Sequence, residues 1–394
     1  MNLRDSEVII GLLRQEGYEL VDLPEKADVV LFNTCSVRAH AEDRVWSQIG
    51  LLASQRVKGA TRQPANPSTR KQIIGVIGCM AQNYKKEIFR RAECVDIVCG
   101  PDNIGNIALY IQEAIRDRKK VLSVKEGRRK DAIYHTGFYE KKDHAYVVIS
   151  EGCENYCSYC IVPYTRGRLR HRPAASIIRE VKEVVGAGIT HITLLGQNVT
   201  GYRGQGSRLP ARQAGHRKQK INFTGLLEKV CAIEGLKSVT FMTSHPKDVD
   251  VKLFKLMAAE SVIRPSLHLP LQSGSDKILK AMNRGYTVKK YLEIIDQFKK
   301  IVYNGNISTD IIIGFPGETD ADFQKTFDVV KSVCFDSAFI FKYSPREGTK
   351  AYLMKGNVPE DVIRERHARL LELQRGISKK NRGQRTETSL RVDG

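Results

Sequence analysis

Three cysteines within eight residues constrain this chain more than any other feature of its sequence. Cys153, Cys157 and Cys160 follow the pattern C-x3-C-x2-C, directly after an apolar run that ends at Ile149. Three thiolates at this spacing can hold three irons of a cubane iron–sulfur cluster, whereas an ordinary ferredoxin site supplies four cysteines. The fourth iron would therefore stay open to a small molecule that chelates through an amino and a carboxylate group.

S-adenosylmethionine carries both of these groups, and an electron from the cluster could cleave its sulfonium to give a 5′-deoxyadenosyl radical. Tyr159, directly before the third cysteine, is then expected near the adenine. The alternative is a structural zinc site completed by a ligand such as His171, because zinc accepts three cysteines and one histidine. The neighbourhood lacks the second cysteine pair that usually completes such a site.

The remaining cysteines fall into two groups. Cys35 and Cys79 each lie just past the end of a predicted strand, at the edge where open α/β sheets keep their binding sites. They are either ligands of a second site or two unrelated buried thiols. The others lie in or beside apolar stretches and are interpreted as small buried hydrophobic residues: Cys94, Cys99, Cys231 and Cys334.

Alternating helical and apolar patterns predict an α/β protein with two domains. In residues 1–138, strand patterns at 28–32, 73–77 and 95–98 alternate with helical patterns at 6–15, 40–52 and 107–115. This alternation predicts a small domain around a parallel sheet. In residues 139–375, helical patterns separate most of six strand candidates, at 145–149, 191–195, 238–242, 266–270, 307–313 and 338–342. Such a series predicts a partial six-stranded (βα)6 barrel that is open on one side.

The C-terminal segment and two insertions complete the predicted organisation. A long amphipathic helix is predicted at 361–380, and residues 376–394 are assigned to a tail. The segments 55–72 and 204–220 are basic surface insertions, either solvated loops or loops that contact RNA.

The charge balance indicates a polyanionic partner. The chain has 64 Lys and Arg residues against 44 Asp and Glu residues, a net charge of +20 that would attract nucleic acid or an anionic membrane. No apolar run approaches the roughly 18 residues of a membrane span, and the first residues lack the apolar region of a signal peptide. We therefore expect a cytoplasmic protein with a nucleic-acid partner and no membrane partner.

Further sequence words narrow the interpretation to one family. The cysteine segment at the start of a partial barrel resembles the radical S-adenosylmethionine (radical SAM) superfamily, and nearly the whole chain resembles its methylthiotransferases. The resemblance rests on 33–38, 41–45, 78–82, 152–168, 195–198, 243–247, 268–275, 282–286, 314–319 and 343–346. Residues 36–38 and 162–168 look most like the members that modify N6-isopentenyladenosine in tRNA.

The resemblance implies a methylthio group added to C2 of that nucleoside, beside the anticodon. Alternatives are the same chemistry on threonylcarbamoyl-adenosine tRNA or on a ribosomal protein aspartate. A rival from another class is a zinc-containing RNA-binding protein without catalysis. The implied partners are the tRNA anticodon stem-loop, an electron donor such as flavodoxin or ferredoxin, and a sulfur donor.

The resemblance also implies two 4Fe–4S clusters and S-adenosylmethionine. The first cluster would bind the cysteine triplet, and the second would bind Cys35, Cys79 and a third cysteine from a Cys-Gln-Met-Asn word, of which this chain has Met1 and Asn2. One S-adenosylmethionine would methylate a sulfur held at the second cluster, and another would supply the radical. Family members also carry an RNA-binding β-barrel of the TRAM type, whose first strand residues 390–394 resemble.

Further site residues are carried over at the ends of barrel strands, where such barrels form their sites. Gly314 could instead belong to a turn, and His245 or His268 could be hydrogen-bonded core residues. Arg166, Arg168 and Arg284 could hold tRNA phosphate, although solvated arginines are common on a basic protein. The expected cofactor-binding residues, besides Tyr159, are Gly196, Gln197, Asn198, Ser244, Gln272, Ile313 and Gly314.

Overall fold

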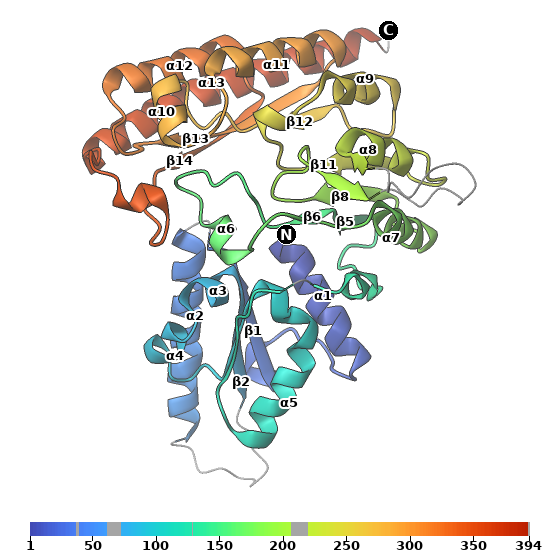
Figure 1. Ribbon diagram of the computed structural model, residues 1–394, viewed down its shortest axis with the longest axis vertical. Coiled ribbons are helices and arrows are strands. Elements are labelled where there is room, and N and C mark those ends of the chain that lie inside the picture. Colours follow the sequence, from blue (N-terminus) through green and yellow to red (C-terminus); the bar gives the residue numbers. More distant parts are fainter. Residues whose placement is uncertain (37–38, 61–71, 128, 206–219, 393–394) are drawn as a thin grey trace. The chain divides into compact units, whose positions relative to one another are not determined.

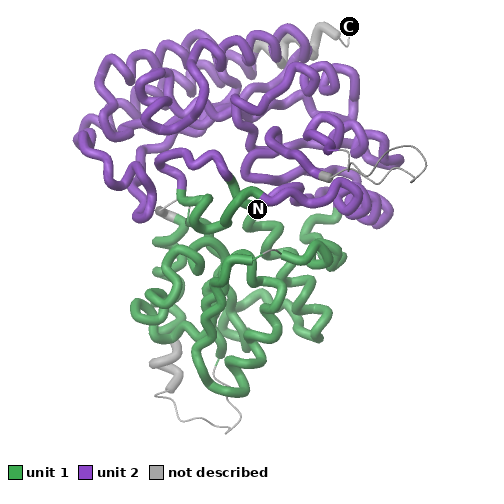
Figure 2. Tube along the Cα trace, viewed as in Figure 1, with its two compact units in different colours: residues 1–142, 151–153, 161–169 green, residues 143–150, 154–160, 170–394 purple. Residues whose placement is uncertain are grey.

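The computed structural model describes residues 1–36, 39–60, 72–127, 129–205 and 220–392. The chain divides into two compact units, shown in green and purple in Figure 2. Unit 1 contains residues 1–142, 151–153 and 161–169, and unit 2 contains residues 143–150, 154–160 and 170–394. The cysteine segment therefore contributes to both units, which a division between residues 138 and 139 did not anticipate.

Unit 1 is built on a parallel sheet in the order β1-β2-β3-β4, which confirms the predicted small α/β domain. Its strands are β1 (Val29–Thr34), β2 (Ile73–Gly78), β3 (Ile97–Cys99) and β4 (Val121–Ser123). The sequence did not reveal β4, because its two apolar residues, Val121 and Leu122, lie between Lys120 and Ser123 and form no longer apolar run. The helices are α1 (Asn2–Gln15), α2 (Ala39–Ala60), α3 (Cys79–Tyr84), α4 (Glu87–Arg91) and α5 (Ile107–Asp117).

The helices of unit 1 cover both faces of its sheet. Figure 1 shows α2 and α4 on one side and α1 and α5 on the other. Every residue of β2 is buried, as expected for a central strand of a parallel sheet. Its side chains contribute to a hydrophobic core with α2, α3 and α4: Ile49, Leu52, Ile74, Val76, Met80, Ala81, Ile88, Val95 and Val98.

Unit 2 contains the six predicted parallel strands in chain order. They form two three-stranded sheets, β5-β8-β11 and β12-β13-β14. Val239 of β11 joins the two sheets: its N–H donates to Val262 O (2.7 Å), and its carbonyl accepts from Arg264 N (3.1 Å), just before β12. The strands are β5 (His144–Val148), β8 (His191–Leu195), β11 (Ser238–Phe241), β12 (Ser266–His268), β13 (Asn306–Ile313) and β14 (Ser337–Lys342).

Amphipathic helices connect these strands, as predicted. At the start of α12, Thr319 and Asp322 form a reciprocal capping box, which fixes where the helix begins after β13. The helices are α7 (Ala174–Gly186), α8 (Phe223–Cys231), α9 (Val251–Ala259), α10 (Asp276–Ala281), α11 (Val288–Ile301) and α12 (Asp320–Val333). Shorter elements are α6 (Val162–Thr165), β6 (Ser150–Glu151) and β7 (Arg170–His171).

The C-terminal helix is longer than predicted. Helix α13 (Glu360–Val392) packs against β13 and β14 and continues past Lys380, where we expected a tail whose end resembles a strand. That interpretation was wrong for residues up to Val392. Residues 376–392 contain no proline and include five Lys and Arg residues, so no residue in them blocks the backbone hydrogen bonds of a helix.

The two basic insertions lie largely outside the described residues. The first begins within α2, and residues 61–71 are not described. The second connects β9 (Arg203–Gln205) to β10 (Lys220–Asn222), which pair antiparallel, and residues 206–219 are not described. No helix in the described part of the chain is both long and apolar enough to cross a membrane.

Candidate active site

The turn after α10 holds part of the cysteine segment in place. Ser158 donates from its backbone N–H to Met282 O (3.0 Å) and from its hydroxyl to Ala281 O (2.8 Å). The Asn283 amide donates to Tyr156 O (2.9 Å). Tyr156 and Asn283 both have left-handed backbones, with φ of 44° and 57°. Because such conformations are costly for residues other than glycine, these bonds fix a specific shape around Cys157.

A buried arginine contacts the sulfur of Cys157. The Arg284 guanidinium donates to Cys157 Sγ (3.3 Å), to Pro270 O (3.2 Å) and to the Tyr286 hydroxyl (3.1 Å). The residue is only 5% exposed. We expected Arg284 to bind tRNA phosphate, but its donors are used inside the protein. Its contacts instead favour a role in supporting a sulfur that carries negative charge.

The first cysteine of the triplet is held within unit 1. Cys153 donates from its backbone N–H to Gly167 O (3.2 Å). Gly152 has φ of 69°, and a Cβ atom there would lie 2.5 Å from Gly167 O and even closer to Arg168 O. Only glycine fits this close approach. The glycine before Cys153 therefore lets the two ends of the cysteine segment pack together.

Cys35 and Cys79 leave the same edge of the unit 1 sheet. Thr34 at the end of β1 pairs with Gly78 at the end of β2, and the two cysteines are the next residues of their chains. Gly78 has φ of 85° and turns the chain so that Cys79 becomes the first residue of α3. Cys79 is buried and Cys35 is half-buried. Because Thr34 and Gly78 are paired, Cys35 and Cys79 each follow a residue at the same position along the sheet edge.

Arg166 contacts Cys79 from the cysteine segment of unit 1. Its Nε–H donates to Cys79 Sγ (3.2 Å), and its terminal nitrogen donates to Asp5 Oδ2 (2.7 Å) and Asn2 Oδ1 (2.9 Å). Arg166 is 4% exposed, so these contacts do not favour the expected phosphate role. Arg168, by contrast, is exposed, and its expected contact with RNA stays a prediction.

Asp5 is the buried anion that balances this region. Its carboxylate accepts from Arg166 on one oxygen and from Arg129 on the other (2.7 Å each). Burial alone would raise the pKa of the Asp5 carboxyl, but the two guanidinium groups outweigh burial and hold that pKa well below its usual range. Asp5 is therefore charged in the folded protein at neutral pH.

Several buried polar atoms after the strands of unit 2 have no hydrogen-bond partner among the described residues. They include the hydroxyls of Ser150 and Ser244, His245 Nε2, Gln272 Oε1 and the Tyr343 hydroxyl. Gln272 also has a left-handed backbone, with φ of 69°. Because buried polar groups are costly when unpaired, these atoms fit a polar ligand at the carboxyl edge of the strands. The hydroxyls, amino group and carboxylate of S-adenosylmethionine are groups of this kind.

Other expected cofactor residues have structural partners. Asn198 donates to Asp248 Oδ2 (2.6 Å) and accepts from Thr200 Oγ1 (2.9 Å), which fixes the turn after β8. The Gly314 N–H donates to Glu318 Oε2 (2.9 Å). Ile313 is fully buried at the end of β13, and Gln197 is half-buried. A Cβ atom on Gly196 would lie 2.5 Å from Ser150 Oγ, which leaves no room for a side chain there. Tyr159 packs on a hydrophobic cluster formed by Ile278, Met282, Phe315 and Ala351.

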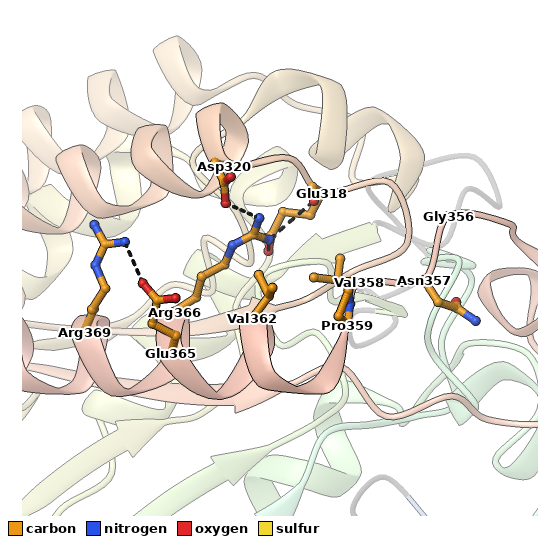
Figure 3. Close-up of a pocket in the computed structure, with 10 residues that line it drawn as sticks. All are labelled: Glu318, Asp320, Gly356, Asn357, Val358, Pro359, Val362, Glu365, Arg366 and Arg369. Atoms are coloured by element: carbon orange, nitrogen blue, oxygen red, sulfur yellow. Dashed lines mark hydrogen bonds and ion pairs between the residues drawn. The ribbon is translucent and has the colours of Figure 1, made fainter.

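A charged pocket of about 480 Å³ lies between the start of α12 and the start of α13. Figure 3 shows Arg366 reaching from α13 to Glu318 and Asp320. Because Glu318 also accepts from the Gly314 N–H, these ion pairs support the turn that ends β13. We therefore interpret the residues that line this pocket as structural support for that turn and not as a ligand-binding site.

The described residues contain no ligand set for the alternative, a structural zinc site. Among them, no three Cys, His, Asp or Glu side chains converge closely enough to hold a single metal ion. A tetrahedral zinc site needs sulfurs within about 4 Å of one another, because each Zn–S bond is about 2.3 Å. Cysteines that each bind a different iron of a cubane lie further apart.

His245 is a neutral donor in the folded protein. Its Nδ1 accepts from the Lys247 N–H (3.3 Å), so the ring proton lies on Nε2, the buried atom without a partner. Burial, together with the cations of Arg284 and Lys247, lowers the pKa of His245 to about 2. The ring therefore presents an N–H at the edge where the polar ligand is expected.

We expect this shift to make the apo chain less stable below about pH 6.5. Above the unfolded pKa of about 6.5 the ring is neutral in both states, but below it only the unfolded chain takes up the proton. The free energy of unfolding should then fall by up to about 1.4 kcal/mol per pH unit. Urea unfolding at pH 7 and pH 5 should show a smaller decline for His245→Gln than for the unmodified chain. Equal declines would contradict the buried neutral histidine.

Comparison with known proteins identifies the family to which this chain is related. Residues 147–330 match the radical SAM superfamily model, and residues 1–100 match the model described as Uncharacterized protein family UPF0004. The tRNA-2-methylthio-N(6)-dimethylallyladenosine synthase of Clostridium botulinum (strain Okra / Type B1) is 42% identical over 97% of this chain and 81% of its own length. The enzyme of that name from Moorella thermoacetica is 41% identical over 96% of this chain and 81% of its own.

The chain belongs to the radical SAM methylthiotransferase family. Members of the radical SAM superfamily use a 4Fe–4S cluster and S-adenosylmethionine. Among solved structures, the radical S-adenosylmethionine methyltransferase from Kitasatospora setae has a TM-score of 0.56 at 14% identity, over 88% of this chain and 73% of its own. At that identity the likeness confirms the fold of this methylthiotransferase and nothing further.

Several residues of the candidate site were not selected from the sequence. Ser150 directly precedes the Glu-Gly-Cys word, and His245 and Tyr343 lie within words that resemble the family. The sulfur contacts of Arg166 and Arg284 had no local signal, because each pairs residues more than 80 positions apart.

Proposed function

We propose that this methylthiotransferase adds a methylthio group to C2 of N6-isopentenyladenosine beside the anticodon of tRNA. The observation that carries the proposal is the identity of 41–42% over 96–97% of the chain to enzymes named tRNA-2-methylthio-N(6)-dimethylallyladenosine synthase. The net charge of +20 suits a polyanionic substrate. Exposed Arg168 is a proposed contact to RNA phosphate.

The cysteine triplet is the proposed radical SAM cluster site. When bound, that cluster supplies the electron that cleaves S-adenosylmethionine to a 5′-deoxyadenosyl radical. Arg284 donates to Cys157 Sγ and supports the ligand sulfur. The buried polar atoms of Ser244, His245 and Gln272 are proposed to bind the polar groups of S-adenosylmethionine.

Cys35 and Cys79 are two of the proposed ligands of a second 4Fe–4S cluster, which we call the auxiliary cluster, and the third cysteine that the family resemblance implies is missing from this sequence. They start at one sheet edge, and the Arg166 guanidinium on Cys79 supports a ligand sulfur that carries negative charge. The auxiliary cluster would hold the sulfur that is methylated and transferred. A flavodoxin or ferredoxin is the proposed electron donor, a separate sulfur donor restores the transferred sulfur, and the cytoplasm is the proposed location.

The substrate test uses the anaerobically reconstituted chain with S-adenosylmethionine and a reductant. The enzyme is offered tRNA with N6-isopentenyladenosine, tRNA with threonylcarbamoyl-adenosine, or a ribosomal protein substrate, and products are identified by mass spectrometry. We expect the methylthio product only from the isopentenyladenosine tRNA. A product from either of the other substrates alone would overturn the proposed substrate while retaining the chemistry.

A further inference from the structure

One short segment of unit 1 contacts both groups of cysteines. The Arg166 side chain donates to Cys79 Sγ (3.2 Å), and the carbonyl of the next residue, Gly167, accepts from the Cys153 N–H (3.2 Å). Both contacts lie within unit 1, which includes residues 151–153 and 161–169. A proposed ligand of the auxiliary cluster and a proposed ligand of the radical cluster are thus tied to adjacent residues.

Buried ion pairs fix the Arg166 side chain. Asp5 accepts from Arg166 and from Arg129, and Arg129 also pairs with Glu151 Oε1 (2.9 Å). These side chains are between 1% and 8% exposed. The contacts therefore form a row of alternating charges that runs from Cys79 through Arg166, Asp5 and Arg129 to Glu151. Glu151 lies two residues before Cys153, so the row ends close to Cys153 in the sequence. Buried ion pairs are often no more stabilising than apolar residues, so stability alone does not account for this row.

We propose that Arg166 is a positioning residue that holds the Cys79 sulfur against the segment anchoring Cys153 and, through its N–H···S bond, sets the redox potential of the auxiliary cluster. This inference rests on the proposed function, because it needs a cluster at Cys35 and Cys79. Positioning matters for the chemistry, since the radical and the sulfur must act on the same carbon of one substrate.

The expected effect follows from charge. Reduction adds an electron to the cluster, and a hydrogen bond from a cation to a ligand sulfur stabilises the reduced form. Removing that bond should shift the potential to a more negative value. Arg166→Lys is informative, because an ammonium group is a point charge and cannot reproduce the planar fork that serves Cys79 and Asp5 together.

The test isolates the auxiliary cluster in a Cys157→Ala/Cys160→Ala background of the full chain. Iron and sulfide content are measured first, followed by a redox titration monitored by electron paramagnetic resonance. We expect Arg166→Lys to give a more negative potential and faster loss of iron to a chelator. Arg366→Lys is the control, because Arg366 is also buried and pairs with two carboxylates, buried Glu318 and exposed Asp320 (Figure 3). Among the described residues, none of the contacts of Arg366 is to sulfur.

A second variant addresses misfolding. In Asp5→Asn/Arg166→Met both charges are removed, so no half-paired carboxylate is left buried, and a more negative potential is again expected. An unchanged potential in both variants would overturn the inference alone. Absence of any cluster in the Cys157→Ala/Cys160→Ala background would overturn the second cluster itself, and the inference with it.

Discussion

Cys153→Ala is expected to reduce 5′-deoxyadenosine formation to the level of a reaction without enzyme. In the proposed function the three thiolates of the triplet would bind three different irons, so loss of one would leave the cluster without the ligand set that keeps a single iron open. The fold should persist, because Cys153 is half-buried and its backbone N–H bond to Gly167 O does not need the sulfur. Mass spectrometry of the nucleoside and far-ultraviolet circular dichroism measure the two properties.

Cys231→Ala is the matched control for that variant. Burial raises the pKa of the Cys231 thiol to about 12, so this cysteine stays protonated and behaves as a small hydrophobic residue of α8. It should keep 5′-deoxyadenosine formation within about twofold of the unmodified chain, since a single conservative change outside the site has little effect. Substantial 5′-deoxyadenosine from Cys153→Ala would remove this residue from the radical cluster.

Cys79→Ala is expected to have the complementary effect, with reductive cleavage of S-adenosylmethionine retained and the methylthio product lost. In the proposed function, cleavage would depend on the triplet, whereas delivery of sulfur would depend on the auxiliary cluster proposed at Cys35 and Cys79. The same reaction mixture can be analysed for 5′-deoxyadenosine and for 2-methylthio nucleoside. Cys35→Ala should behave in the same way.

Cys99→Ala separates a ligand effect from general damage to the sheet. Cys99 ends the neighbouring strand β3, and burial raises the pKa of its thiol to about 12. Both products should therefore form with Cys99→Ala. If Cys79→Ala formed the methylthio product at the same rate as Cys99→Ala, Cys79 would have no part in sulfur transfer.

The sequence alone determined the parallel α/β architecture and the positions of the cysteines along it. Strand and helix periodicity are local properties, so the six strands of unit 2 and the unit 1 sheet could be predicted from patterns of a few residues. The spacing of Cys153, Cys157 and Cys160 is local as well, and it indicated the cluster chemistry that the family match then supported. Strand β4 has only two adjacent apolar residues, Val121 and Leu122, which is too little pattern to be detected.

Only the tertiary structure decided which polar side chains face the site and which are used inside the protein. Arg166 and Arg284 looked like surface cations for RNA, yet both are buried and donate to cysteine sulfurs. Asn198 looked like a cofactor ligand, yet its polar atoms hold a turn. The sequence gives residue type and spacing, but burial and hydrogen-bond partners depend on residues brought together from distant parts of the chain, and no local pattern records them.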